Sequence, residues 1–182
     1  MRPVLRGLRA VNDAVQRVVV VGAALLIALI VVVIFGGALA RYATGVGFGM
    51  VQELPPMLMP WVIFPMAGVL LRSDTHITVD FLPAFLSANG MRVLRVVVSL
   101  VAMVAGVILC IAGLKAVALF RLTGQVTEME WAFPIWWIYV SFPVGFAILV
   151  SSALENILGA ILGDGQPKLD LPEEAEAQSY VA

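Results

Sequence analysis

The side chains best suited to chemistry lie in one short stretch, Leu71 to Leu86, of an otherwise apolar chain. The only histidine, His76, lies between Asp74 and Asp80, and Arg72 precedes all three. Carboxylates and imidazoles ligate metals and transfer protons, so a metal centre and acid–base catalysis are the two chemistries to consider. One histidine and two aspartates at this spacing make a poor ligand set, and no further carboxylate-rich segment lies nearby.

Other enzyme classes fail on the residues that they require. A serine or cysteine hydrolase needs a base within reach of its nucleophile, and His76 is the single histidine available. A membrane haem needs histidines on facing helices. A disulfide-exchanging enzyme needs paired cysteines, whereas the chain has Cys110 alone. We therefore predict that the chain is not an enzyme, holds no cofactor or metal, and binds no nucleic acid.

The composition places this polar stretch in a membrane protein. The chain has 182 residues, of which 62% are hydrophobic and 13% charged, and its mean hydropathy is +1.03. Four runs without a charged residue are each long enough to cross a hydrocarbon core of roughly 30 Å. They cover residues 18–40, 54–71, 96–114 and 131–154. We predict an all-α membrane protein with one four-helix domain over residues 1–162 and a disordered, acidic tail over residues 163–182.

Two of these runs need comment. The first holds 23 residues without a charge, which exceeds the about 7–15 apolar residues of a signal peptide, so we interpret it as a retained span. The second contains four prolines. Pro55 and Pro56 fit a first helical turn, where amide hydrogens lack partners in any case, and Pro60 and Pro65 are expected to bend the helix.

The basic residues predict the orientation. Four spans put both chain ends on one side, which carries eight basic residues against three on the other. The eight are Arg2, Arg6, Arg9, Arg17, Arg72, Arg92, Arg95 and Lys168. The positive-inside rule then places both termini, and the loop between the second and third spans, in the cytoplasm.

That loop has the pattern of a short helix lying in the membrane interface. Asp80 is a suitable N-cap, and Gly90 has the position of a glycine that ends a helix. Four apolar residues share one helical face between them: Phe81, Leu82, Phe85 and Leu86. On this interpretation the histidine and aspartates belong to a structural loop.

The segment from Gln52 to Leu82, "QELPPMLMPWVIFPMAGVLLRSDTHITVDFL", resembles the small membrane subunit of tripartite ATP-independent periplasmic (TRAP) transporters, the DctQ family. In the family pattern an acidic residue opens the second span and a tryptophan lies within it. An arginine, a His-Ile or His-Val pair and an aspartate follow. A further arginine is common at the end of the first span. The matching positions here are Glu53, Trp61, Arg72, His76, Asp80 and Arg41. Gln52, where many relatives carry a second acidic residue, and the four prolines depart from the pattern.

The resemblance implies a function that composition cannot give. Such systems import carboxylates or related acidic solutes by symport. A periplasmic binding protein delivers the solute, and a large multispan permease subunit carries the substrate and ion sites. The small subunit supports the large one in the bacterial inner membrane. The six matching residues are then expected at partner or lipid interfaces, with Trp61 packed on the large subunit and Arg72 meeting lipid phosphate.

The spans themselves contain few polar groups. None of the four runs holds an acidic residue or a histidine well inside it, whereas ion-coupled transporters place such residues near the midplane. A self-contained small oligomeric transporter or channel, the main alternative, would need pore-lining polar residues. The third and fourth spans each carry small residues at four-residue spacing, which allow close approach of another helix in lipid: Ala102, Gly106 and Cys110, and Ser141 and Gly145.

Overall fold

A computed structural model of the protein describes residues 2–47, 49–72, 88–128 and 132–162. The helices are α1 (Arg2–Thr44), α2 (Gly49–Arg72), α4 (Ala88–Thr123), α5 (Ile135–Tyr139) and α6 (Ser141–Leu162). Within the described residues four segments are long and apolar enough to cross a membrane, with α5 and α6 forming the last of them together. This confirms an all-helical chain with four candidate spans.

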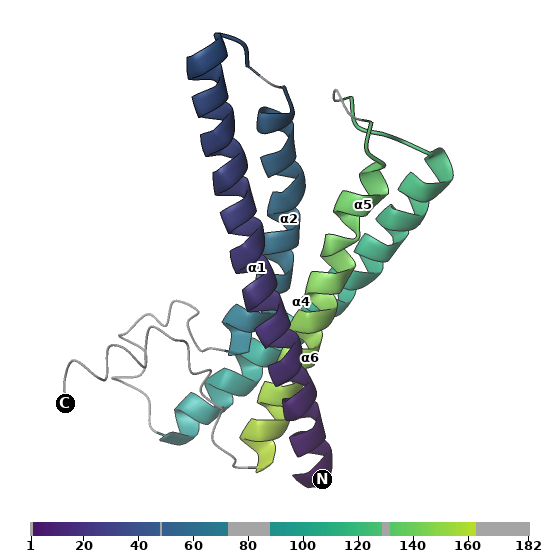
Figure 1. The fold of residues 1–182 in the computed structure, drawn as a ribbon. Coiled ribbons are helices and arrows are strands. Elements are labelled where there is room, and N and C mark those ends of the chain that lie inside the picture. The colour runs from purple at the N-terminus through teal and green to yellow at the C-terminus, as the bar shows by residue number, and fades with distance from the viewer. Residues whose placement is uncertain (1, 48, 73–87, 129–131, 163–182) are drawn as a thin grey trace, which may run out of the picture.

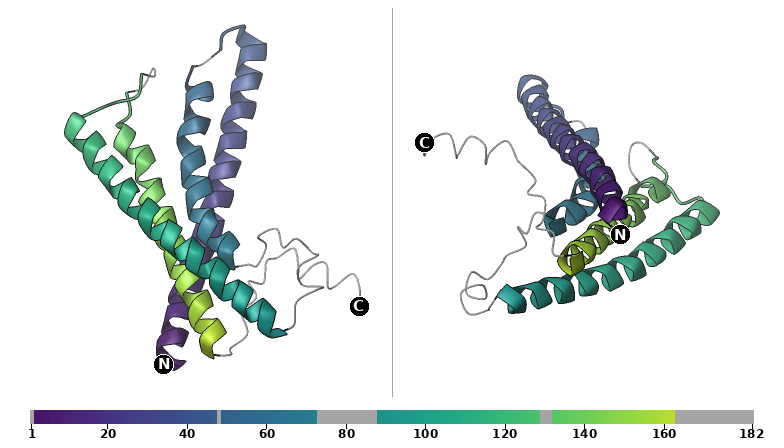
Figure 2. Two further views of the ribbon diagram at one scale, coloured as in Figure 1. Left: turned by 180° about the vertical axis from the view of Figure 1, so that it is seen from behind. Right: turned by 90° about the horizontal axis from the view of Figure 1, so that it is seen from below.

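The helices form two arms that meet at one end. Figure 1 shows α1 beside α2, and α4 beside α5 and α6, and both views of Figure 2 agree. The arms come together towards the N-terminus and diverge towards the loops that join α1 to α2 and α4 to α5. We call these the N-terminal end and the loop end of the bundle. Helix α6 contacts α1, α2 and α4, so it is the central element.

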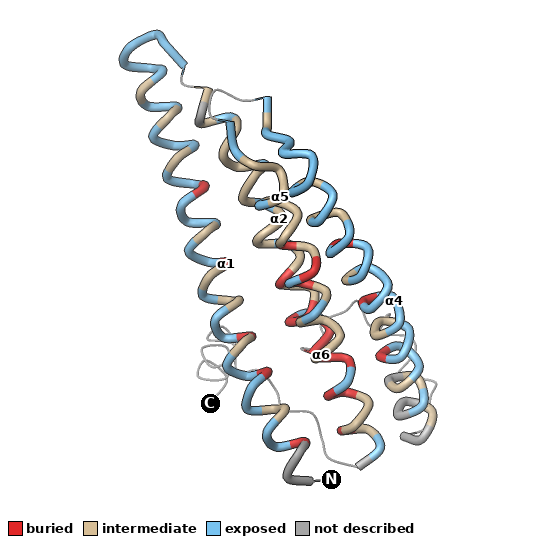
Figure 3. The backbone as a smooth tube through the Cα atoms, turned by 90° about the vertical axis from the view of Figure 1, so that its right-hand side faces the viewer, coloured by how far each residue is buried: buried red, intermediate tan, exposed pale blue. Residues whose placement is uncertain are grey.

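Close packing around α6 depends on glycines. A Cβ atom at Gly68 of α2 would lie 2.7 Å from Cγ2 of Ile148, and one at Gly106 of α4 would lie 2.8 Å from Cγ2 of Val150. A Cβ at Gly145 would collide with the backbone of Phe64. Figure 3 shows that buried residues cluster on α6 and the faces opposite it, while much of α1 is exposed. Of the small residues predicted to allow close helix approach, Gly106 thus packs α4 on α6, and Gly145 packs α6 on α2.

The helices are longer than the apolar runs that predicted them. Helix α1 begins at Arg2, so the charged segment before residue 18 is helical, and α4 continues to Thr123. Helix α6 ends at Leu162, beyond the predicted boundary at residue 154. Hydropathy detects only the apolar part of a helix, because backbone hydrogen bonding continues into polar turns.

Two local predictions are corrected. Helix α2 begins at Gly49, so Pro55 and Pro56 lie beyond its first turn, and it continues as one helix through all four prolines. Gly90 does not end a helix, because it lies inside α4. The rest of the predicted interfacial helix, apart from Ala88 and Asn89 in α4, lies outside the described residues.

Candidate functional site

The main polar feature of the described residues is a buried cluster at the N-terminal end of the bundle. At its centre is Arg72, the last residue of α2, whose side chain is 3% exposed. Its Nη2 lies 2.9 Å from Oε1 of Glu155 on α6 and 2.6 Å from Oδ1 of Asp13 on α1. Its Nη1 donates to Oε1 of Gln16 at 3.1 Å. One guanidinium thus joins three helices.

A second set of hydrogen bonds surrounds this centre. Asn12 donates from Nδ2 to Oε2 of Glu155 at 2.7 Å, and its Oδ1 accepts from the hydroxyl of Ser151 at 2.7 Å. Gln16 donates from Nε2 to Oγ of Ser152 at 3.3 Å. Both carboxylate oxygens of Glu155 therefore have donors, and its side chain is only 2% exposed. We call these residues, with Arg72 and Asp13, the polar network.

The network follows from two helical repeats. Asn12 and Gln16 are four residues apart on α1, and Ser151 and Glu155 are four apart on α6, so each pair lies on one helix face. Next to Glu155, Asn156 donates from Nδ2 to the carbonyl of Leu71 at 3.2 Å. This bond satisfies a carbonyl in the last turn of α2, where no further helical turn supplies a donor.

The charges of the network are balanced within the protein. Two carboxylates, Asp13 and Glu155, contact Arg72, and Nε of Arg9 lies 3.8 Å from Oε1 of Glu155. Both oxygens of the Glu155 carboxylate are already bound by donors of the protein. Among the described residues no group of three or more histidine, cysteine, aspartate or glutamate side chains could hold a metal ion. The arrangement is suited to joining helices.

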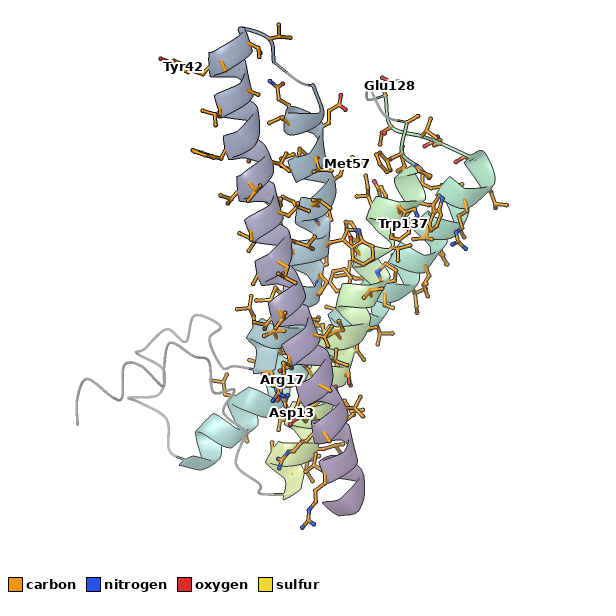
Figure 4. The ribbon with its side chains drawn as sticks, viewed as in Figure 1. Asp13, Arg17, Tyr42, Met57, Glu128 and Trp137 are labelled. Atoms are coloured by element: carbon orange, nitrogen blue, oxygen red, sulfur yellow. The ribbon has the colours of Figure 1, made fainter. Side chains whose placement is uncertain are left out.

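Beyond the polar network, from the middle of the bundle towards the loop end, helices are held together differently, by aromatic rings. The rings of Phe64 and Phe142 have centroids 3.8 Å apart, and those of Phe120 and Tyr139 are 4.4 Å apart. The guanidinium carbon of Arg121 lies 4.2 Å above the ring of Trp136. In Figure 4 Asp13 and Arg17 lie towards the N-terminal end, and Tyr42, Glu128 and Trp137 lie towards the loop end.

The residues predicted to lie at interfaces have different surroundings in the structure. Arg72 is enclosed by protein, which corrects the expected contact with lipid phosphate. The ring of Trp61 lies 6.1 Å from that of Trp137, so part of its surface packs within the chain. Arg41 is exposed in the last turn of α1 and Glu53 is half-buried near the start of α2. Contacts of Arg41, Glu53 and Trp61 with a partner or with lipid stay predictions. His76 and Asp80 lie outside the described residues.

Sequence reasoning missed most of the network. The fourth predicted run ends at Leu154, one residue before Glu155, and the first begins at residue 18, after Asn12 and Gln16. Glu155 lies inside the candidate span Ile135–Ile161 but within its last two turns, so the predicted run stops just short of it. The available signal was polar residues at four-residue spacing on both flanks: Asn12 and Gln16, and Ser151 and Glu155.

Comparison with known proteins gives one family. The sequence model for "Tripartite ATP-independent periplasmic transporters, DctQ component" matches residues 30–163, which is most of the chain and includes α2, α4, α5 and α6. No curated protein and no solved structure matches the chain.

Proposed function

The chain belongs to the DctQ component family of TRAP transporters, and from this premise we propose what it does within such a system. It is the small permease subunit, a multi-pass protein of the bacterial inner membrane. It supports a large multispan subunit that performs ion-gradient-driven uptake of an organic acid, in particular a carboxylate. A periplasmic binding protein delivers the solute, and both termini of this chain lie in the cytoplasm.

The observation that carries this proposal is the polar network. Ion-coupled transport uses ionisable side chains that can exchange an ion or solute near the midplane. The buried ionisable side chains of the described spans, Arg72 and Glu155, lie at the N-terminal end and bind one another. Their bonds connect α1, α2 and α6, which supports a rigid, supporting subunit rather than a substrate pathway.

The distribution of exposed side chains leaves apolar surface on which a partner subunit can pack. Large apolar side chains are exposed along α1 and α4, among them Leu25, Phe35, Val101 and Ile108. Lipid can cover such surfaces, and so can the apolar surface of another membrane subunit. The family's tripartite organisation favours the second for at least one of these faces.

Two measurements test the proposal together. A tagged chain isolated from native membrane in mild detergent should bring with it a large multispan protein in fixed stoichiometry. The chain alone, reconstituted in liposomes with an inward sodium gradient, should not accumulate any member of a panel of carboxylates. Adding the copurified large subunit and the binding protein should restore uptake.

The outcomes separate this function from its main alternative. Gradient-dependent accumulation by the chain alone would show a self-contained transporter and contradict the supporting role. Uptake by the large subunit and binding protein that is unchanged when this chain is left out would contradict it as well. Restored uptake of neutral sugars but not of carboxylates would overturn the proposed solute class while leaving the supporting role in place.

A further inference from the structure

A line of exposed arginines runs along the N-terminal part of α1. Arg6 and Arg17 are both exposed, and a separation of 11 residues is close to three helical turns, which puts them on the same side of the helix. Neither forms an ion pair or hydrogen bond among the part of the chain that the structure describes. This differs from Arg72 and Arg9, which lie close to Glu155.

The acidic residue between these arginines does not neutralise them. Asp13 lies between Arg6 and Arg17 in sequence, and its Oδ1 is 2.6 Å from Nη2 of the buried Arg72. Asp13 is thus paired with Arg72, although its side chain is 49% exposed. Glu155 is enclosed by the polar network. The two arginines therefore give this side of α1 an excess of positive charge.

The depth of this charge in the membrane follows from the neighbouring helix. The candidate span Ile135–Ile161 has 27 residues, so it is about 40 Å long against a hydrocarbon core of roughly 30 Å. Gln16 contacts Ser152, less than three turns before the end of that span. With an overhang of about 5 Å at each end of the span, Ser152 and the neighbouring Arg17 lie roughly 8–10 Å inside the core boundary, and the long Arg17 side chain extends towards the headgroups. Arg6 lies about 16 Å further out along α1.

The surface beyond Arg17 is apolar and exposed. Val21 and Leu25 follow Arg17 at successive four-residue steps on the same side of α1, and they are 53% and 66% exposed. This side of the helix thus presents cationic groups next to an apolar stripe. A phospholipid has the complementary arrangement, with an anionic head joined to acyl chains.

We propose that the side of α1 carrying Arg6 and Arg17 binds anionic phospholipid, with the headgroup phosphate at the arginines and an acyl chain along Val21 and Leu25. A soluble phosphate would use the arginines but gain nothing from the apolar stripe. The arginines that contact lipid in this proposal, Arg6 and Arg17, are not part of the polar network. It is independent of the function proposed above.

The test uses the full chain in nanodiscs of phosphatidylcholine with a minority of phosphatidylglycerol, in which the lipid retained by the protein is measured by native mass spectrometry. Attraction of about 1 kcal/mol per basic residue near an anionic surface corresponds to about fivefold in affinity. R17Q should therefore lower retained phosphatidylglycerol about fivefold, and R6Q/R17Q should lower it further. R41Q, which removes an exposed arginine at the other end of the same helix, is the matched control and should have no effect.

Each contrary result overturns the proposal. Equal retention by wild type and R6Q/R17Q would show that these arginines bind no lipid. Equal loss in R41Q would show attraction to any basic residue. Displacement of the lipid by glycerol phosphate at matched concentration would identify a site for free anions. Unchanged lipid retention with loss of a copurifying protein in R6Q/R17Q would assign this side of α1 to a protein partner. Reduced phosphatidylglycerol retention by L25A would support the acyl-chain contact. Unchanged retention by L25A would contradict it.

Discussion

The two ends of the bundle are joined by different physics. At the N-terminal end, α1, α2 and α6 meet through Arg72, Glu155 and the amides and hydroxyls around them, with most donors and acceptors buried. Towards the loop end, the helices meet through aromatic rings and glycines, and the arms diverge. Both regions lie in helices apolar enough to span a membrane.

This difference teaches what each kind of contact can specify. Lipid tails are as apolar as a leucine side chain, so apolar surface alone gives helices little reason to associate in a bilayer. A glycine contact sets how closely two helices approach. A hydrogen-bonded charge pair also sets which residues face each other, because a mismatched arrangement leaves a buried charge without a partner. We infer that the polar network fixes the register of α1, α2 and α6, and that the glycines fix their distance.

The sharpest way to break this comparison is to remove one charge from the network. R72L leaves Glu155 buried without its guanidinium, which is expected to lower the free energy of unfolding by about 3–5 kcal/mol. Substitution of both residues, R72L/E155L, removes the uncompensated charge and should recover much of that loss. Unfolding is measured as the loss of the helical circular dichroism signal when sodium dodecyl sulfate is added to the protein in mixed micelles.

R41L is the control for this prediction, since Arg41 is exposed at the opposite end of α1. It should change the stability by a few tenths of a kcal/mol at most, as a typical surface substitution does. A double variant as unstable as R72L would mean that the polar bonds themselves, rather than the avoidance of an unpaired charge, hold this end together.

The second prediction concerns the close approach of α2 to α6. G68A and G145A place a methyl group against the backbone of the facing helix, and such overpacking typically costs about 1–3 kcal/mol. G22A and G36A are matched controls, because a Cβ atom at either position meets nothing within 4 Å. If all four variants unfold at the same denaturant concentration, close approach contributes nothing to the stability of the bundle.

The smallest effect is expected at the loop end. R121Q removes the cation from above the ring of Trp136, and an exposed cation–π contact contributes about 0.5–1 kcal/mol. R121K keeps the charge and should retain part of the contact. The emission of a variant whose single remaining tryptophan is Trp136 reports the contact directly. Identical spectra for arginine and glutamine at position 121 would show that the two groups do not interact in solution.

Much of the fold could be predicted from the sequence because it depends on composition. Runs of apolar residues without charge, such as residues 18–40, require a helix wherever they meet lipid, since no other structure satisfies the backbone within one segment. The four candidate spans were available in this way. The family resemblance rested instead on the order and spacing of residues around Trp61 and Arg72. The small-residue spacing also indicated close helix approach, which Gly106 makes with α6 and Gly145 makes with α2.

Only the tertiary structure decided the role of the charged residues. Arg72 follows an apolar run just as a lipid anchor would, and Glu155 lies just past a predicted span. Nothing in either local sequence indicates that residues separated by 83 positions meet, because the contact depends on how α2 and α6 cross. The same crossing engages Asp13 with Arg72 and leaves Arg6 and Arg17 outside the network. Hydropathy is a property of each segment alone, whereas the pairing of buried charges is a property of the distances between segments.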